Sequence, residues 1–304
     1  MKSQRKLLSI IAAGVLAASV NSSAWAEPLK IGVSFQEMNN PYFVTMKETL
    51  EAAAKSIGAQ LIVTDSRHDV SKQVSDVEDM LQQGIDILIL NPTDSAGVQS
   101  AVMSAHDKKV TIISVDADAK GPIDSYVGSN NYDAGVKACE YLAITVKKGN
   151  VAILDGIPSQ GILDRVRGCK DALSKHSEIK IVSIQNGKQE RDQALAVTEN
   201  ILQANPDLKG IFSVNDNGSL GALAAIDSSG LDVKLVSVDG APEAIQAIQK
   251  PGSHFIATSA QFPRQQARLS LALALAKHWG AGIPRNYPVD VELIDGAKAK
   301  TFSW

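Results

Sequence analysis

The stretch KIGVSFQEMNNPYFVTMKETLEAAAKSIG, residues 30–58, shows the element from which the fold is built. It opens with a short run of apolar and β-branched residues, which predicts a buried strand. Asn39, Asn40 and Pro41 then give the start signal of a helix, and Gly58 gives its stop signal. A strand followed closely by a helix is the building unit of an α/β protein.

This unit recurs along the chain, because apolar runs alternate with helical patterns such as the one over residues 95–107. Runs that are apolar on both faces favour parallel strands covered by helices on each side. We therefore predict a doubly wound parallel sheet. The runs are KIGVSF (30–35), AQLIVT (59–64), DILIL (86–90), VTIISV (110–115), NVAIL (150–154), KIVSI (180–184), GIFSV (210–214), KLVSV (234–238) and FIATSA (255–260).

A segment rich in Gly, Ser, Asn and Asp, residues 121–131, interrupts this alternation. Strands and helices then resume at about half the length of the chain. This restart predicts two similar lobes rather than one wide sheet, with a crossing between them near Ser129.

The first 26 residues have the order of a secretory signal peptide. Three basic residues come first, an uncharged run over residues 7–20 follows, and the small-residue triplet Ala24-Trp25-Ala26 predicts cleavage before Glu27. A retained membrane anchor is the alternative, but the apolar run is shorter than the roughly 20 residues that a spanning helix needs. We expect an exported, periplasmic protein.

Charge and length restrict the class of protein. The formal net charge is −3, and it becomes −6 without residues 1–26, which hold three basic residues and no acid. An acidic chain disfavours a nucleic-acid partner. The remaining residues, 27–304, exceed one typical core and fit two domains.

Two cysteines, Cys139 and Cys169, are present. An even number in an exported chain permits one disulfide, while two buried thiols are the alternative. Two cysteines without clustered histidines make no metal site, and no cofactor motif occurs.

Polar residues follow most of the predicted strands. In open α/β sheets, ligands bind beyond the carboxyl ends of the strands, where carboxylates and amides suit a polyhydroxylated ligand. Helix capping is the alternative role for each of these residues. They are Asn91, Asp116, Asp155, Asn215, Asp239 and Gln261.

Two further features fall near the same edge. Tyr42 and Phe43 either lie against the apolar face of a ligand or belong to the core. Arg165 and Arg167 open the helix after the run NVAIL, and because they are two residues apart, at most one of them can face the crevice.

Nearly the whole chain from residue 27 resembles the periplasmic ribose-binding group of sugar-binding proteins of ABC importers, which have the type I periplasmic binding protein fold. The carrying motifs are Asn39-Asn40-Pro41-Tyr42-Phe43, Asn91-Pro92-Thr93-Asp94, Asn215-Asp216, Val238-Asp239-Gly240, Gln261 and Tyr287-Pro288-Val289-Asp290.

The resemblance implies a ligand site between two lobes that close on a monosaccharide or sugar alcohol. It also implies delivery to a permease in the inner membrane, or presentation to a chemoreceptor, by a monomer. The family's sugar contacts fall on Asn40, Tyr42, Phe43, Asn91, Asp116, Asn131, Arg167, Asn215, Asp239 and Gln261.

The resemblance further implies a hinge of three crossing strands near Ser129-Asn130, Gln261-Phe262 and Asp290-Val291. The N-terminal lobe is then expected to hold residues 27–129 and 262–290. The C-terminal lobe is expected to hold residues 130–261 and 291–304.

Four positions depart from the ribose binders, which carry an arginine at Ala117, an aromatic residue at Gln189 and at Val238, and a serine at Gln36. Losing an arginine and two ring walls changes both the donors and the shape of the pocket. We expect these four residues at the site and a sugar or polyol other than ribose as the ligand.

Two other classes of protein are disfavoured. An enzyme of this fold would be expected to carry a G-x-S-x-G elbow, a P-loop or a G-x-G-x-x-G fingerprint, and the sequence contains none of them. A sugar-responsive repressor would begin with a helix-turn-helix, where this chain has the predicted signal peptide.

Overall fold

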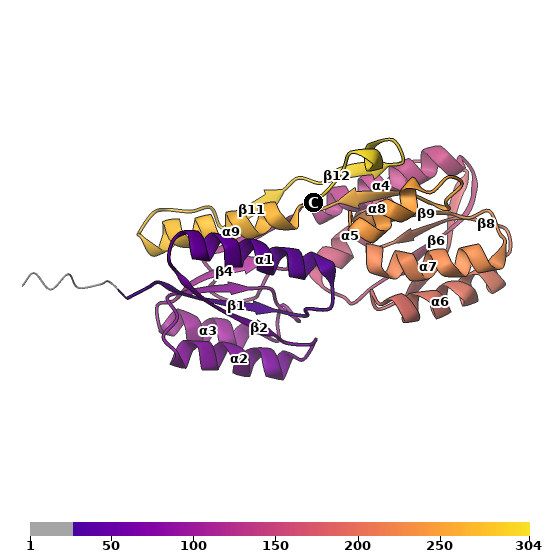
Figure 1. Ribbon diagram of the computed structural model, residues 1–304. Helices are drawn as coiled ribbons and strands as arrows, with labels where there is room; N and C mark the ends of the chain where they lie inside the picture. The colour runs from indigo at the N-terminus through magenta and orange to yellow at the C-terminus, as the bar shows by residue number, and fades with distance from the viewer. Residues whose placement is uncertain (1–26) are drawn as a thin grey trace, which may run out of the picture.

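The computed structural model describes residues 27–304, which form two α/β lobes side by side (Figure 1). Each lobe is built around a six-stranded sheet with helices on both faces. The predicted signal peptide, residues 1–26, lies outside the described residues. Within residues 27–304, no helix combines the length and the apolar content required to cross a bilayer.

The N-terminal lobe has an entirely parallel sheet with the strand order β11-β5-β4-β3-β1-β2. Helices α1 and α9 pack together on one face, and α2 and α3 cover the other. The strands are β1 (Lys30–Phe35), β2 (Gln60–Asp65), β3 (Ile87–Leu90), β4 (Thr111–Val115), β5 (Ser125–Ser129) and β11 (Asn286–Val289), and the helices are α1 (Pro41–Ser56), α2 (Val70–Gln82), α3 (Gln99–Asp107) and α9 (Pro263–His278).

The C-terminal lobe repeats this arrangement with the order β12-β10-β9-β8-β6-β7, in which only β12 is antiparallel to its neighbour. Helices α4 and α5 cover one face, and α6, α7 and α8 lie over the other. The elements are α4 (Asn131–Val146), β6 (Gly149–Asp155), α5 (Gln160–Leu173), β7 (Ile179–Asn186), α6 (Arg191–Ala204), β8 (Leu208–Ser213), α7 (Asp216–Ser229), β9 (Lys234–Asp239), α8 (Pro242–Gln249), β10 (Phe255–Ala260), β12 (Glu292–Asp295) and the 3₁₀-helix Lys298–Lys300.

The two sheets have the same order, so each strand of one lobe has a counterpart in the other. Strand β4 corresponds to β9, β3 to β8, β1 to β6 and β2 to β7, while α1 corresponds to α5. The chain passes from one sheet to the other after β5, after β10 and between β11 and β12. Residues that follow strands of both sheets line one cavity, so the carboxyl ends of both sets of parallel strands face the space between the lobes.

The predicted α/β fold with two similar lobes is confirmed, and every predicted apolar run contains a strand. The apolar pattern missed three strands: β11 and β12, which lie at sheet edges, and β5, which lies between β11 and β4. Strand β5 has the sequence SYVGS, whose glycine and serines are typical of a linker, and β11 and β12 have four residues each.

Helix α3 begins at Gln99, later than the predicted residue 95. Asp94 accepts hydrogen bonds from the backbone N–H of Ala96 (2.9 Å) and of Gly97 (2.6 Å). This side chain therefore holds the preceding residues in a turn, as aspartate commonly does.

Cys139 of α4 and Cys169 of α5 form a disulfide in the structure, which resolves the two possibilities left open by the sequence. Both residues are fully buried in the core between these helices and the sheet. The bond lies within the C-terminal lobe and does not line the cavity between the lobes.

Candidate functional site

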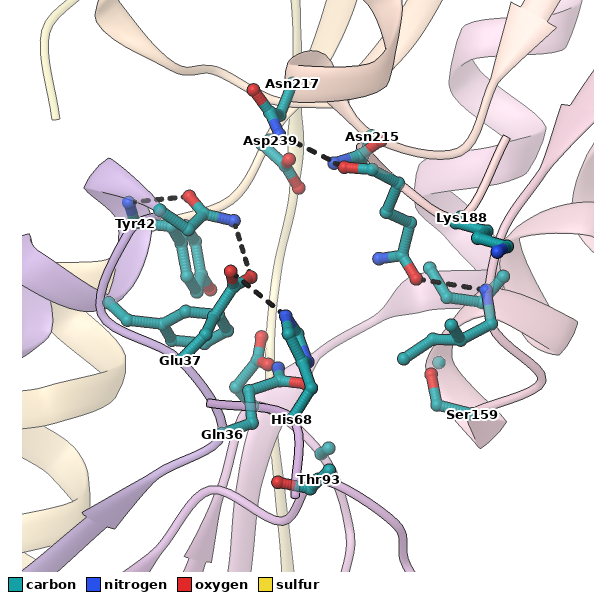
Figure 2. A pocket seen from close by; sticks show the side chains of 18 of the residues that line it. Gln36, Glu37, Tyr42, His68, Thr93, Ser159, Lys188, Asn215, Asn217 and Asp239 are labelled. Carbon is teal, nitrogen blue, oxygen red and sulfur yellow. Dashed lines mark hydrogen bonds and ion pairs between the residues drawn. The ribbon is translucent and has the colours of Figure 1, made fainter. Parts of the chain in front are cut away.

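A cavity of about 420 Å³ lies between the lobes at the carboxyl ends of both sheets (Figure 2). This volume is within the range of about 300–1,000 Å³ that small-molecule sites occupy. Side chains from both lobes line it, so a ligand held there would touch both. The predicted residues that line the cavity are Gln36, Asn40, Tyr42, Phe43, Asp116, Ala117, Asn131, Gln189, Asn215, Asp239 and Gln261.

The start of α1 forms one wall. Asn40 is its N-cap, and its side chain accepts a hydrogen bond from the N–H of Tyr42 at 3.0 Å, which fixes the first turn. Tyr42 and Phe43 are 3% and 4% exposed, so both rings pack into the core while one side of each still faces the cavity. The two rings therefore belong to the core and also line the cavity, so the alternatives of core packing and cavity exposure both apply.

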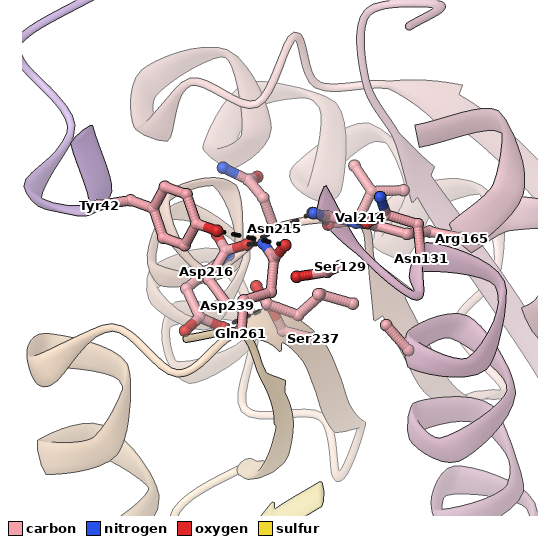
Figure 3. A network of polar contacts seen from close by, with 12 residues as sticks. Tyr42, Ser129, Asn131, Arg165, Val214, Asn215, Asp216, Ser237, Asp239 and Gln261 are labelled. Atoms are coloured by element: carbon pink, nitrogen blue, oxygen red, sulfur yellow. Dashed lines mark hydrogen bonds and ion pairs between the residues drawn. The ribbon is translucent and has the colours of Figure 1, made fainter. Parts of the chain in front are cut away.

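The opposite wall carries a polar network centred on Asp239 (Figure 3). The Asp239 Oδ1 atom accepts hydrogen bonds from Gln261 Nε2 at 2.7 Å and from Arg165 Nη1 at 3.3 Å, and Oδ2 accepts from the backbone N–H of Asp216 at 3.2 Å. Burial raises the pKa of Asp239, and the Arg165 guanidinium opposes that rise. Asp239 is thus a buried carboxylate with a cation beside it.

Arg165 is held rigidly at the base of this wall. Its Nε donates to Asn131 Oδ1 at 2.7 Å, and its Nη1 donates to the carbonyl oxygen of Val214 at 2.8 Å. The side chain is 7% exposed. A guanidinium fixed by three acceptors presents its remaining N–H groups in one direction.

Asp216 lies behind the cavity wall and is fully buried. It accepts hydrogen bonds from Ser237 Oγ at 2.6 Å, from Thr258 Oγ1 at 2.8 Å and from the N–H of Ala241 at 2.7 Å. Burial, with a smaller contribution from the Asp239 charge, raises the pKa of Asp216 to about 7. This residue ties α7 to β9 and β10 and supports the position of Asp239.

Asp116 is one of three carboxylates that the N-terminal lobe contributes to the cavity, together with Glu37 and Asp94. It follows β4 with a φ of +66°, a left-handed conformation that aspartate tolerates better than most residues. Asn91 Nδ2 donates to its Oδ2 at 3.2 Å. Burial raises the pKa of Asp116 to about 6, opposed mainly by the charge of Arg165 from the other lobe.

Two loops with matching backbone form the mouth of the cavity. Arg67 and His68 after β2, and Lys188 and Gln189 after β7, all have positive φ angles. His68 Nε2 lies 3.2 Å from Glu37 Oε2, and the hydrogen bond between them raises the pKa of His68. Figure 2 shows the two loops on opposite sides of the cavity.

The expectation that Arg167 faces the crevice is wrong, and Arg165 lines the cavity instead. Residues two apart on a helix point to nearly opposite sides, so only one of them can do so. The Arg167 side chain is 62% exposed, pairs with Asp164 at 2.9 Å and lies over the Tyr132 ring at 5.1 Å.

Two more predicted residues lie behind the cavity wall. Val238 is fully buried in the core against α4 and α5, because alternate residues of β9 point to opposite faces. Asn91 is also fully buried, and its Oδ1 accepts from the N–H of Gln36 at 3.2 Å. Asn91 therefore positions Asp116 rather than facing the cavity itself.

Several lining residues were not predicted from the sequence. Most of them come from the segments after β1, β3 and β6, and the others follow β2, β7 and β8, so the lining extends beyond the one residue directly after each strand. They are Glu37, Asn39, His68, Pro92, Thr93, Asp94, Ile157, Ser159, Gly161, Ile162, Lys188, Glu190 and Asn217.

The sequence was compared with protein-family models and with characterised proteins. The family model described as "Periplasmic binding protein domain" matches residues 31–280. The ribose import binding protein of Bacillus subtilis (strain 168) is 37% identical over 268 residues, covering 85% of this chain and 87% of that protein.

Solved structures of solute-binding proteins are similar to this chain in both sequence and fold. An ABC transporter periplasmic solute-binding protein from Actinobacillus succinogenes 130z with bound D-allose is 32% identical, with a TM-score of 0.85, and the match covers 90% of this chain and 100% of that one. The Caulobacter myo-inositol binding protein, bound to myo-inositol, is 31% identical with a TM-score of 0.82, and the match covers 90% and 95%.

Proposed function

The chain belongs to the periplasmic binding protein domain family, and on this premise we propose that it captures a monosaccharide or sugar alcohol in the periplasm for an ABC importer. Its relatives include sugar import binding proteins, which supports this role. The observation that carries the proposal is that polar groups of both lobes line one cavity: Asp116 on one side, and Asp239 with Arg165 on the other.

The proposed mechanism is closure of the two lobes on the ligand. The lobes comprise residues 27–129 with 262–290 and residues 130–261 with 291–304, and they bend at the three crossings. A ligand that touches both walls makes all its hydrogen bonds only when the lobes are closed, so its binding favours the closed state. The closed protein then delivers the ligand to the membrane permease.

Selectivity follows from the same closure. Once water is removed, a ligand that lacks one hydroxyl leaves a buried acceptor or donor without a partner, which costs about 1–3 kcal/mol. The fixed Arg165 and the carboxylates Asp116 and Asp239 are the groups expected to enforce this selection.

A thermal-shift screen tests the proposal. The protein, expressed with its leader and refolded to remove carried-over ligand, is heated with pentoses, hexoses, deoxy sugars, inositols and linear polyols. A ligand that binds only the folded state at a hundred times its Kd adds about 2.7 kcal/mol and raises the Tm.

We expect a shift from at least one of these compounds that disappears in Asp239→Ala and Asn215→Ala. Silence of the whole carbohydrate panel, together with a shift produced by amino acids or another class of solute, would overturn the assignment to sugars.

A further inference from the structure

The two lobes place one aspartate each at equivalent points of the cavity. Asp116 follows β4, Asp239 ends β9, and these strands are counterparts in the two sheets. Both residues have a positive φ, +66° and +137°. The cavity therefore contains a pair of carboxylates related by the internal repeat of the fold.

The surroundings of the two carboxylates differ in charge. Asp239 has a guanidinium beside it, since Arg165 of α5 lies 3.3 Å from its Oδ1. The counterpart of α5 in the N-terminal lobe is α1, whose first turns hold Tyr42 and Phe43. The first basic residue of α1 is Lys47, and it pairs with Glu51 at 2.7 Å.

Among the described residues, the side-chain donors to Asp116 are Asn91 and the Tyr42 hydroxyl, and both are neutral. The residue after it is Ala117, which also lines the cavity and carries no charge. Arg165, the cation that acts most strongly on Asp116, already serves Asn131, Val214 and Asp239. One desolvated carboxylate on the N-terminal wall thus lacks a cation of its own.

Asp116 is partly buried, and a carboxylate shielded from water without a neighbouring cation is costly, so a ligand can stabilise it by supplying the missing charge. We propose that the cavity selects an amino-substituted monosaccharide or cyclitol, with its ammonium group on Asp116 and its hydroxyls on the Asp239–Arg165 wall. This inference rests on the proposed function, because it specifies the substrate class of the same site.

The same charge arrangement disfavours anionic sugars. A carboxylate or phosphate group of a ligand, placed beside Asp116, would be repelled by its negative charge. An N-acetyl group in place of the ammonium keeps an N–H donor but carries no positive charge. A hydroxyl already donates to the charged carboxylate, and an ammonium adds the attraction of opposite charges, for which we expect a gain of about tenfold in binding.

Isothermal titration calorimetry near neutral pH tests the proposal with matched compounds. The probes are glucose with glucosamine, N-acetylglucosamine and glucuronate, and the corresponding galactose and mannose series. At least one amino sugar is expected to bind about tenfold more tightly than its parent. Its N-acetyl form should lose that advantage, and the acid should not bind.

Two variants test whether the preference for amino sugars depends on the Asp116 carboxylate. Asp116→Asn keeps a residue that tolerates the left-handed backbone, and Ala117→Arg supplies a cation beside Asp116. Each is expected to reduce the ratio of amino-sugar to parent-sugar affinity to about one. Asp107→Asn, at the exposed end of α3, removes the same charge far from the cavity and should leave the ratio unchanged.

The calorimetry results distinguish failure of the amino-sugar proposal from failure of the proposed function in sugar capture. If neutral sugars bind and no amino sugar binds more tightly than its parent, the charge inference is wrong while the role in sugar capture stands. If no compound of this panel or of the thermal-shift screen binds, both fail. A preference that survives Asp116→Asn in a protein with unchanged folding also refutes the role of Asp116.

Discussion

Replacing Arg165 with methionine tests the polar wall of the cavity most directly. The guanidinium donates to Asn131, to the carbonyl oxygen of Val214 and to Asp239, at 2.7, 2.8 and 3.3 Å. The side chains of Arg165 and Asp239 are 7% and 11% exposed, so water cannot readily replace these bonds. Methionine fills similar volume and removes the charge.

The expected loss follows from the buried pair. Removing one partner of a buried ion pair leaves an uncompensated charge, which costs about 3–5 kcal/mol. We expect Arg165→Met to lower the free energy of unfolding by about that amount and to abolish binding of any ligand found in the screen. Adding Asp239→Asn to the same protein should recover part of the stability, because the unpaired charge is then removed.

Arg167→Met is the matched control, since it lies on the same helix and its ion pair with Asp164 is exposed. Exposed ion pairs contribute about 0–1 kcal/mol, so this variant should retain nearly full stability and full affinity. Urea denaturation gives the stability, provided that the slope with denaturant is unchanged. The reasoning is refuted if Arg165→Met loses less than about 1 kcal/mol, or if the two variants behave alike.

Three further outcomes follow from the structure. Because burial raises the pKa of Asp216 from 3.8 to about 7, the folded state binds the proton more tightly than the unfolded state. The free energy of unfolding without ligand should therefore fall as the pH rises from about 4 to 7. Asp216→Asn should flatten this part of the pH dependence when denaturation curves are measured across that range. Replacing Cys139 and Cys169 with alanine should lower the free energy of unfolding by about 3–4 kcal/mol and leave calorimetric affinity unchanged, because the disulfide lies away from the cavity. Tyr42→Phe removes the hydroxyl that accepts from Gln266 Nε2 at 2.9 Å, so we expect the free energy of unfolding in urea to fall by about 1 kcal/mol, while ligand affinity is retained because the proposed ring contact remains; a loss of binding equal to that of Tyr42→Ala would contradict this division of roles.

The sequence alone determined the fold class and about half of the residues that line the cavity. Parallel strands buried on both faces must be apolar throughout, so their pattern is visible in the chain, and polar residues that follow such strands gather at one edge. Asp116, Asn215 and Asp239 were therefore predictable as neighbours in space although more than a hundred residues separate the first from the last.

Only the tertiary structure decided which of two arginines enters the cavity and how the charges there are balanced. The sequence shows that Arg165 and Arg167 point in different directions, but the packing of α5 against α4 and the sheet selects Arg165. The weak strands β5, β11 and β12 likewise depend on neighbours that no local pattern reveals. Propensity is a local property, whereas the partner of a buried charge or an edge strand is fixed by contacts between distant segments.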